Sequence, residues 1–595
     1  MCALDKIIAV LYNPKLSVYM IFITVKGIQM SFDLNNYIVS GIMSLLGDQN
    51  RKRYLKMAEN VDSFSEKLLL GILKKNQDTE LGRKLNLGDI HSVLEYQDRV
   101  PYSEYEDYRE YVERMAKDGE QNLMSADKIS FLATTSGTTG VTKRIPVSQQ
   151  STVPMVRVEL IMEYLIDKSM KLNHVTSGRG LNSIETVNSY TESGMAEGYV
   201  SSYAMQSGSL LLPAINCIPK EVDGTVNADM KYIKARYSLA YKDLVYLGGL
   251  FMSTATDLVK YIADNKDMLI NDIEHGVIDP SVDMPGELRQ KLTDKLHPDK
   301  ERAEELREAL DFSRPEGILK RVWPNLSAIL AIGSGEFESF KNKMRVYCGS
   351  TVHFVNAVYA SSEAVFATAY DIDNEDYLMV PDGGFFEFIP VDDAFDEKKD
   401  RPLLMHQLEE GKHYEVVVTN YSGLYRYRIK DVIRVVGHVG MIPLIHFAYR
   451  KAQLINITGV KLTAEHMVDV MRAISHRVGV QIIDYSVYPD TESEPWRMKV
   501  FIEFDGEISD RYDLAAIFDE ELSRVNEEHG HMLRIGETSP SVVYVLHRNA
   551  SKELREENAK KKISDNQVKA IRYINSKSLL RDYMKRVKKA YGKGA

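Results

Sequence analysis

One short segment of the chain combines the residue types that bind a polyphosphate. From Phe131 to Pro146 it reads Phe-Leu-Ala-Thr-Thr-Ser-Gly-Thr-Thr-Gly-Val-Thr-Lys-Arg-Ile-Pro, so that hydroxyl residues, Gly137 and Gly140 precede Lys143. Glycines let the backbone curl until successive N–H groups converge on one point, and hydroxyls add further donors. The segment therefore predicts a phosphate-binding loop.

The flanks of this segment indicate what kind of loop it is. Residues 128–134 and 144–147 have the β-branched and aromatic content of strands. A loop between two strands differs from the strand–loop–helix of a P-loop, and no G-x-x-x-x-G-K-[ST] sequence occurs. An ordinary Gly/Thr hairpin without a ligand is the alternative interpretation.

Composition limits the other classes of function. The 595 residues are 44% hydrophobic and 27% charged, which favours a folded protein of more than one domain. Three scattered cysteines indicate neither a disulfide framework nor a zinc site, and we expect a cytoplasmic protein. No H-E-x-x-H or G-x-S-x-G sequence is present, which argues against a metalloprotease or a serine hydrolase.

Charge is unevenly distributed. The net charge of −10 gives no electrostatic reason to expect a nucleic-acid ligand. Residues 551–595, however, carry fourteen Lys or Arg against five Asp or Glu. This tail is either an RNA or membrane patch or the solvated face of helices, and the helical spacing of residues 579–591 favours the solvated face.

The amino terminus contains only a short apolar run. Val18–Val25 is too short to span a bilayer, so we expect no membrane anchor. Met30 precedes Ser-Phe-Asp-Leu-Asn and could be the natural start, which makes residues 1–29 a candidate non-native extension.

The order of the expected elements predicts an α/β fold. Residues 50–125 have helical periodicity, and from residue 126 strands alternate with helices, which favours a mainly parallel layered core. Antiparallel strands are expected at 385–390, 414–419 and 425–436. We expect a large N-terminal domain over 30–450 and a small mobile α+β domain over 451–595.

Further motifs follow the loop in a fixed order. The ordered motifs are Asn76-x-x-Thr79-Glu-x-Gly82-Arg83, Thr135–Thr139, Trp323-Pro, Ile332-Gly-Ser-Gly335, Tyr359-Ala-Ser-Ser-Glu363, Phe385–Pro390, Tyr425-Arg-Tyr-Arg-x-x-Asp431-Val and Gln567-Val-Lys569. In these motifs the chain resembles the auxin-responsive (Gretchen Hagen) family of acyl acid–amido synthetases, within the acyl-adenylating superfamily that includes acyl-CoA synthetases, peptide-synthetase adenylation domains and luciferases.

The resemblance implies an ATP- and Mg²⁺-dependent reaction. A carboxylic acid is adenylated with loss of pyrophosphate, and the acyl group is then transferred to an amine, an amino acid in this family. Because both reactants are anions, positioning and charge neutralisation supply most of the catalysis. The residues implied for ATP are Thr135, Ser136, Gly137, Thr138, Thr139, Gly140, Lys143, Tyr359, Ser361, Asp431 and Arg450.

The same resemblance implies roles for individual residues. Tyr359 is expected against adenine, Glu363 at Mg²⁺ and Asp431 at the ribose hydroxyls, whereas a helix cap is the alternative interpretation of the Tyr359–Glu363 segment. Lys569 is expected at the α-phosphate, with one of Lys560–Lys562 in that role, or a plain surface lysine, as the alternatives. The family has glycine where this chain has Lys430, and Ala570 departs from the family's tail motif, which puts the ribose geometry and activity in question.

The acyl acid is expected among apolar residues. By position, the candidate substrate residues are Tyr203, Met205, Phe251, Met252, Gly333 and Ser334, although apolar side chains there would serve equally as core. The expected partners are a small carboxylic acid and an amino acid or other amine. The protein itself is expected to be a monomer. The rival interpretations are an acyl-CoA ligase, a nucleotide-binding protein that has lost catalysis, and an RNA-binding protein.

Overall fold

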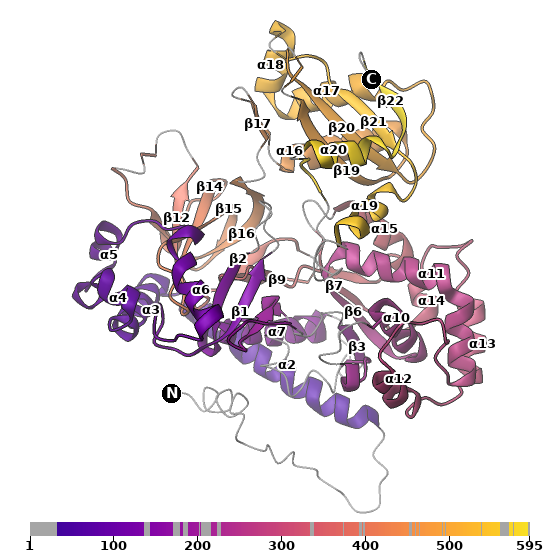
Figure 1. Cartoon of the computed structure of the whole chain (residues 1–595), viewed down its shortest axis with the longest axis horizontal. Helices are drawn as coiled ribbons and strands as arrows, with labels where there is room; N and C mark the ends of the chain where they lie inside the picture. Colours follow the sequence, from indigo (N-terminus) through magenta and orange to yellow (C-terminus); the bar gives the residue numbers. More distant parts are fainter. Residues whose placement is uncertain are drawn as a thin grey trace, which may run out of the picture. The chain divides into compact units, whose positions relative to one another are not determined.

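A computed structural model provides the coordinates (Figure 1). It describes residues 32–135, 143–169, 179–182, 189–201, 203, 216–222, 228–333, 338–372, 374–391, 395–396, 399–451, 455–457, 460–462, 464–490, 492–493, 495–536, 538–559, 571–574 and 576–592. None of the helices in these ranges is long and apolar enough to cross a bilayer.

The chain forms two compact units. Unit 1 contains residues 1–332, 344–429 and 434–446, and unit 2 contains residues 333–343, 430–433 and 447–595. The candidate carboxylates are therefore divided between them: Glu363 belongs to unit 1, and Asp431 to unit 2.

A parallel sheet forms one part of unit 1. Its strands are β3 (Arg179–Asn182), β6 (Leu244–Phe251), β7 (Ala328–Ile332) and β8 (His353–Val355), in that order, and every neighbouring pair is parallel. Helix α11 (Met252–His275) follows β6, and α15 (Glu338–Cys348) follows β7. The expected strand–helix alternation is confirmed here.

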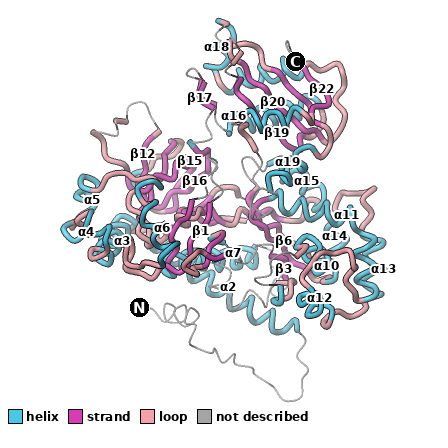
Figure 2. The backbone as a smooth tube through the Cα atoms, in the orientation of Figure 1, coloured by secondary structure: helices cyan, strands magenta, loops and turns pink. Residues whose placement is uncertain are grey.

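The largest sheet has a different architecture (Figure 2). It contains eight strands in the order β13-β12-β14-β15-β16-β11-β10-β9, and every pairing whose register is known is antiparallel. The strands are β9 (Val358–Ala360), β10 (Val365–Ala369), β11 (Tyr377–Met379), β12 (Phe385–Pro390), β13 (Leu403–Leu404), β14 (His413–Thr419), β15 (Tyr427–Val439) and β16 (Ile442–Arg450).

This sheet corrects one expectation and confirms another. A mainly parallel core is wrong, because several of these strands follow one another through short connections, which join antiparallel neighbours. The three strands expected between residues 385 and 436 are present as β12, β14 and β15, and β12 pairs with β14 antiparallel.

A third sheet contains the candidate phosphate hairpin. Its order is β2-β1-β5-β4, with β1 (Ile129–Thr135), β2 (Lys143–Ser148), β4 (Ser189–Tyr190) and β5 (Ala196–Gly198). Both predicted flanking strands are thus confirmed. Helix α7 (Gln149–Ser169) continues from β2, and α2 (Phe32–Met57) runs beside it (Figure 1).

Short helices precede the hairpin, as the sequence predicted. They are α3 (Val61–Asn76), α4 (Glu80–Lys84), η1 (Leu87–Asp89), α5 (Val93–Arg99), η2 (Tyr105–Asp107) and α6 (Arg109–Asp118). Thr79 caps α4 by accepting a hydrogen bond from the N–H of Gly82 at 2.9 Å. A Cβ at Gly82 would lie 2.0 Å from the Asn76 oxygen, so this family motif shapes a turn.

Helices connect the successive strands β3, β6 and β7 of the parallel sheet in the sequence. They are η3 (Lys220–Val222), α10 (Met230–Ala240), α11, α12 (Gly286–Thr293), α13 (Lys300–Ala309) and α14 (Ile318–Val322). Trp323 is fully buried, and its indole N–H donates to the Ser238 oxygen at 2.8 Å. The Trp-Pro motif is therefore a core anchor.

Unit 2 contains the smaller α+β fold. Its sheet has the order β19-β20-β21-β22, with β19 (Ile482–Asp490), β20 (Arg497–Phe504), β21 (Val542–Leu546) and β22 (Val587–Tyr591). The remaining elements are β17 (Ile455–Ile457), β18 (Val460–Leu462), α16 (Ala464–Val478), α17 (Leu514–Val525), α18 (Glu527–Ile535), α19 (Ala550–Ala559) and α20 (Lys577–Met584).

The basic tail is largely paired inside this unit. Lys588 lies 2.6 Å from Glu507, Lys577 lies 2.5 Å from Glu492, and Lys589 pairs with Asp510. These pairs support a solvated face rather than a nucleic-acid patch. The expected helical spacing over 579–591 is wrong in its second half, because α20 ends at Met584 and β22 follows.

Candidate functional site

The structure describes the phosphate hairpin up to the residue pair at the base of its loop. Thr135 ends β1 and lies opposite Lys143, the first residue of β2. The side chain of Thr135 and the predicted ligands Ser136, Gly137, Thr138, Thr139 and Gly140 lie outside the described residues. Their assignment to ATP phosphates stays a prediction.

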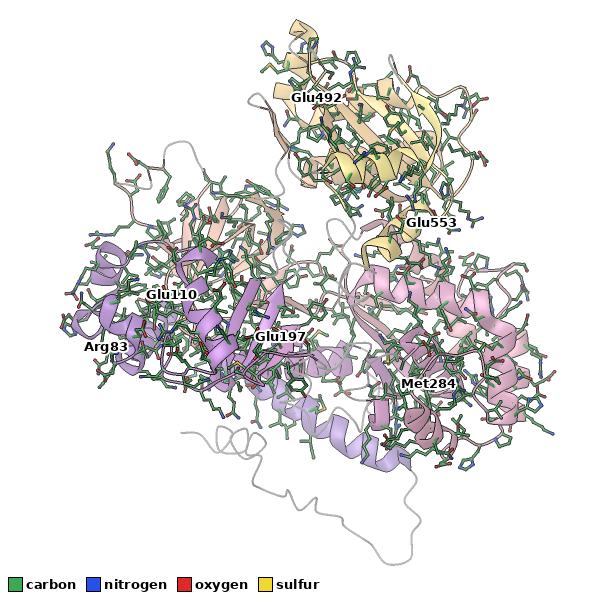
Figure 3. All side chains as sticks on the ribbon, in the orientation of Figure 1. Arg83, Glu110, Glu197, Met284, Glu492 and Glu553 are labelled. Carbon is green, nitrogen blue, oxygen red and sulfur yellow. The ribbon has the colours of Figure 1, made fainter. Side chains whose placement is uncertain are left out.

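Tyr105 supports the base of this hairpin. Its hydroxyl accepts a hydrogen bond from the Arg144 N–H at 3.1 Å, and the Lys143 ammonium lies 5.4 Å from its ring centroid. The Arg144 guanidinium in turn donates to Glu197 at 2.8 Å; Figure 3 labels Glu197 beside strand β1. Both cations that follow the loop are therefore oriented by side chains of unit 1.

The same support connects to the Tyr-Arg-Tyr-Arg motif. Tyr108, one turn beyond Tyr105, accepts from the N–H of Tyr425 at 2.8 Å and donates to its carbonyl oxygen at 3.0 Å. Ser103 also donates to that oxygen at 2.7 Å. Burial raises the pKa of Tyr108 to about 12, so its hydroxyl remains protonated and keeps both bonds.

The two arginines of that motif are structural. Arg426 is 4% exposed, donates to Glu387 at 3.1 Å and to the Val100 oxygen at 2.7 Å, and stacks over Tyr102. Burial raises the pKa of Glu387, although Arg426 opposes the shift. Arg428 makes two hydrogen bonds to Glu415. This part of the motif attaches the N-terminal helices to the eight-stranded sheet.

Glu363 lies in a tight turn between β9 and β10. The Ser361 N–H donates to the Ala364 oxygen at 2.9 Å, and the Ser361 hydroxyl donates to Glu363 Oε2 at 2.5 Å. The Glu363 N–H donates back to the Ser361 hydroxyl at 3.2 Å. The helix-cap interpretation of this segment is wrong, because a strand follows the turn and no helix begins there.

Tyr359 lies on the strand that leads into this turn. Its ring is 8% exposed, stacks on Phe366 at a centroid distance of 4.9 Å and also contacts Tyr377. The position expected against adenine is therefore part of an aromatic cluster that fixes the ring's orientation.

Asn420 holds the Glu363 turn from the neighbouring loop. Its Nδ2 donates to the Glu363 main-chain oxygen at 2.8 Å, and its Oδ1 accepts from the N–H groups of Ser422 and Leu424, both at 3.0 Å. Ser422 continues the connection, because its hydroxyl accepts from the Ser148 N–H at 3.1 Å. The sequence analysis missed this residue, although the turn-forming sequence Asn-Tyr-Ser-Gly marked a loop.

Asp431 and Arg450 are paired in unit 2. The Arg450 Nε donates to Asp431 Oδ1 at 2.5 Å; the aspartate side chain is 2% exposed and the arginine side chain 35%. The sequence analysis named both residues but predicted separate contacts with the nucleotide. Strands β15 and β16 bring them together across nineteen positions of sequence.

Lys430, next to Asp431, has an unusual backbone. Its φ angle is +65°, in the left-handed region that favours glycine. The glycine of the family pattern would adopt this conformation without steric cost. In this chain a lysine adopts that conformation, at the steric cost that a Cβ brings.

The described residues fit Mg²⁺ bound together with phosphates. Mg²⁺ takes oxygen ligands and is commonly held by one or two carboxylates plus substrate phosphates. Glu363 supplies one such carboxylate on a fixed turn, and the described residues contain no cluster of three or more His, Cys, Asp or Glu that would form a site by itself. One carboxylate together with substrate phosphates is a donor set that suits Mg²⁺.

The candidate acyl-acid residues are only partly described. Tyr203 stacks on Phe131 at a centroid distance of 4.6 Å, Met252 is fully buried at the start of α11, and Gly333 is buried directly after β7. The side chain of Phe251 and all of Met205, Ser334 and Lys569 lie outside the described residues. Their roles stay predictions.

Comparison with known proteins identifies the family to which this chain belongs. Three successive family models match the chain: the GH3 family N-terminal domain over residues 50–353, the central domain over 377–450 and the C-terminal domain over 465–578. The chain belongs to the GH3 family. The Glu363 turn falls between the first two matches, whereas Asp431 and Arg450 lie within the central-domain match.

Curated relatives are amido synthetases. An indole-3-acetic acid-amido synthetase of Oryza sativa subsp. indica is 26% identical over 481 residues, covering 77% of this chain and 78% of the relative. A jasmonoyl–L-amino acid synthetase of Oryza sativa subsp. japonica is 25% identical over 540 residues, covering 85% and 90%.

Solved structures agree on the fold. The AtGH3.15 acyl acid amido synthetase in complex with 2,4-DB matches with a TM-score of 0.81 at 22% identity, covering 92% of this chain and 97% of that one. A 2-hydroxyisobutyryl-CoA ligase in the postadenylation state matches with a TM-score of 0.52 at 13% identity, covering 89% and 94%. The expected α/β fold with a separate smaller C-terminal domain is confirmed.

Proposed function

We propose that this GH3 protein is an ATP-dependent acid–amino acid ligase. An oxygen of the substrate carboxylate attacks the α-phosphorus of ATP, the bond to the bridging oxygen breaks, and pyrophosphate leaves. The amine nitrogen of an amino acid then attacks the acyl carbon and loses a proton, and AMP leaves with the electrons of the acyl–oxygen bond.

One observation carries this proposal. Family matches run along the chain from residue 50 to residue 578, and the two described carboxylates at adenylate-forming positions, Glu363 and Asp431, are both oriented by hydrogen bonds. The curated relatives that match over three quarters of the chain or more are amido synthetases. We therefore favour a working enzyme over a nucleotide-binding scaffold.

The chain's own residues divide the work between holding ATP and stabilising charge. Tyr359 orients the base, Asp431 accepts hydrogen bonds from the ribose hydroxyls, and Arg450 fixes that carboxylate. Thr135, the hairpin loop and Lys143 hold the phosphates. Lys569 neutralises the charge that develops at the α-phosphate, where fixed cations lower the barrier most.

Finer features complete the proposal. Glu363 would hold Mg²⁺, which would supply positive charge to the ATP phosphates when bound. The catalytic unit is a monomer in the cytoplasm, with residues 30–450 as the ATP- and acid-binding domain and residues 451–595 as a mobile domain that carries Lys569. The acid is a small apolar or aromatic carboxylic acid bound near Tyr203, Met205, Phe251, Met252, Gly333 and Ser334.

A matrix of acids and amino acids tests the proposal. Purified protein is incubated with ATP, Mg²⁺, aromatic and aliphatic acids, and each of the amino acids; pyrophosphate release and product masses are measured. Amide products with stoichiometric AMP are expected. Thioester formation when coenzyme A replaces the amino acids, without any amide, would overturn the amide assignment in favour of the acyl-CoA ligase.

Lys569→Ala tests the assignment of the catalytic lysine. Acid-dependent pyrophosphate release should fall by about 100-fold or more, whereas ATP binding should remain. Lys560→Ala, a change of the same kind in the same lysine-rich tail, is the control and should retain activity. Equal activity of the two variants would contradict the role given to Lys569.

A further inference from the structure

We infer that Asn420 is a positioning residue for the proposed metal ligand Glu363, and this inference rests on the proposed function. Asn420 lies in the loop between β14 and β15, fifty-seven positions beyond Glu363 in the sequence. Nothing in the family matches assigns it a role, and it was not among the residues that the sequence predicted.

The geometry of the side-chain amide is fully determined. Asn420 is 2% exposed and makes three hydrogen bonds: one from Nδ2 to the Glu363 oxygen, and two to Oδ1 from the N–H groups of Ser422 and Leu424. Exchanging the amide nitrogen and oxygen would set donors against donors and the oxygen against a carbonyl. Only the observed orientation satisfies all three partners.

These bonds require an amide at this position. A carboxylate would keep both acceptor bonds but would place a negative oxygen against the Glu363 carbonyl. An aliphatic side chain would leave two loop N–H groups and one carbonyl without partners in a buried site, which is costly. Serine is too short to reach from the loop to the Glu363 turn.

The hydrogen bond from Asn420 to Glu363 matters because the other hydrogen bonds of the turn join residues of the turn itself. Ser361 orients the Glu363 carboxylate, but Ser361 and Ala364 belong to the same four-residue turn. Asn420 is the described side chain that attaches the turn's main chain to another loop. That loop is itself held by Ser422 to Ser148 at the end of β2, so Asn420 fixes where the Glu363 carboxylate lies relative to strand β2.

Asn420→Asp is the test, with metal binding as the readout. Mn²⁺ is titrated into protein with equimolar ATP, and protein-bound Mn²⁺ is followed by its enhancement of water-proton relaxation, with Mn²⁺ and ATP alone as the blank because ATP itself binds Mn²⁺. Loss of a partner that orients a metal ligand lowers metal affinity by about 10- to 100-fold, so we expect a rise of at least about tenfold in the Mn²⁺ dissociation constant and a matching rise in the Mg²⁺ requirement for pyrophosphate release.

Asn50→Asp is the matched control. Asn50 is 1% exposed, and its Nδ2 donates to the Leu46 oxygen at 2.9 Å within α2. The change removes the same kind of bond and buries the same charge in α2, where the bond stays within the helix and does not reach the Glu363 turn, so it should lower stability without changing Mn²⁺ affinity. If Asn420→Asp does not fold, the uncharged pair Asn420→Ser and Asn50→Ser carries the same comparison.

A double variant separates positioning from general destabilisation. In a Glu363→Gln background, Asn420→Asp should have no further effect on Mn²⁺ affinity, because the ligand through which it acts is gone. Unchanged Mn²⁺ affinity in Asn420→Asp, or an equal change in Asn50→Asp, overturns the inference. Failure of the proposed function is distinguishable, because wild-type protein and Asn50→Asp would then release no acid-dependent pyrophosphate.

Discussion

The Ser361–Ala364 turn and the Lys430–Asp431 segment each present a candidate catalytic carboxylate, and the chain fixes the two by different means. Glu363 is held by hydrogen bonds from neutral groups, the Ser361 hydroxyl and, through its main chain, the Asn420 amide. Asp431 is held by the charged Arg450 and follows a lysine with φ of +65°.

This difference suits the partners that the two carboxylates are proposed to meet. A carboxylate that is to bind a cation gains from neutral neighbours, because a nearby guanidinium would repel the metal. A buried carboxylate whose other partners are neutral hydroxyls needs a charged partner within the protein, and Arg450 is such a partner for Asp431. The two kinds of support are thus consistent with the two proposed roles.

The largest expected effect is on the stability of the fold at the buried Arg426–Glu387 pair, which joins the loop before β15 to β12. Arg426→Met leaves Glu387 buried without its partner, and breaking such a pair costs about 3–5 kcal/mol. Burial already raises the pKa of Glu387, and the variant removes the charge that opposes this shift. Chemical unfolding should therefore show a large loss at pH 7 and a smaller loss at pH 5.

The sign of this pH effect follows from linkage. A carboxyl group whose folded pKa lies above its unfolded value is relieved by protonation, so its stability contribution is present at low pH and is lost as pH rises through the folded pKa. A loss that is larger at pH 5 than at pH 7 would contradict the assignment of the cost to ionised Glu387.

Glu363→Gln tests the carboxylate that is proposed to bind the metal ion. The amide oxygen can still accept the Ser361 bond, so the fold should be unchanged, whereas removing charge stabilisation at a transferring phosphoryl group costs about 100-fold in rate. Steady-state pyrophosphate release measures it. Glu95→Gln, at the exposed start of helix α5 where the carboxylate accepts the His91 N–H at 2.7 Å, is the control and should be fully active.

Asp431→Asn tests the ribose side. The substituted amide would keep an acceptor for Arg450 but lose the charge, and hydrogen bonds to charged groups contribute roughly 1.5–3 kcal/mol. The KM for ATP should therefore rise about tenfold or more, with no change in the Mg²⁺ requirement. A raised Mg²⁺ requirement with unchanged KM for ATP would reverse the roles assigned to the two carboxylates.

The smallest effect concerns the strain at Lys430. Lys430→Gly and Lys430→Ala both remove the side chain's interactions, but only glycine adopts a positive φ without a steric penalty. The glycine variant should exceed the alanine variant in unfolding free energy by about 1 kcal/mol, measured by urea denaturation. Equal stability of the two variants would show that the backbone there is not strained.

Sequence reasoning anticipated the parts of this architecture that local patterns determine. The hairpin strands β1 and β2 and the elements from α16 to β21 follow from apolar periodicity over a few residues. The antiparallel order of the eight-stranded sheet was missed, because strand pairing depends on residues far apart in the chain. The same reason hides the Asn420–Glu363 bond and the Asp431–Arg450 pair, although each of the three charged residues was named.

Oxygen-isotope transfer tests the central claim most directly. The protein is incubated with ATP, an amino acid and the acid identified in the substrate matrix, whose carboxylate carries ¹⁸O at both oxygens, and the AMP is analysed by mass spectrometry. If the carboxylate attacks the α-phosphorus, each AMP formed acquires one ¹⁸O atom. Amide formed together with unlabelled AMP, or with ADP in place of AMP, would contradict adenylation.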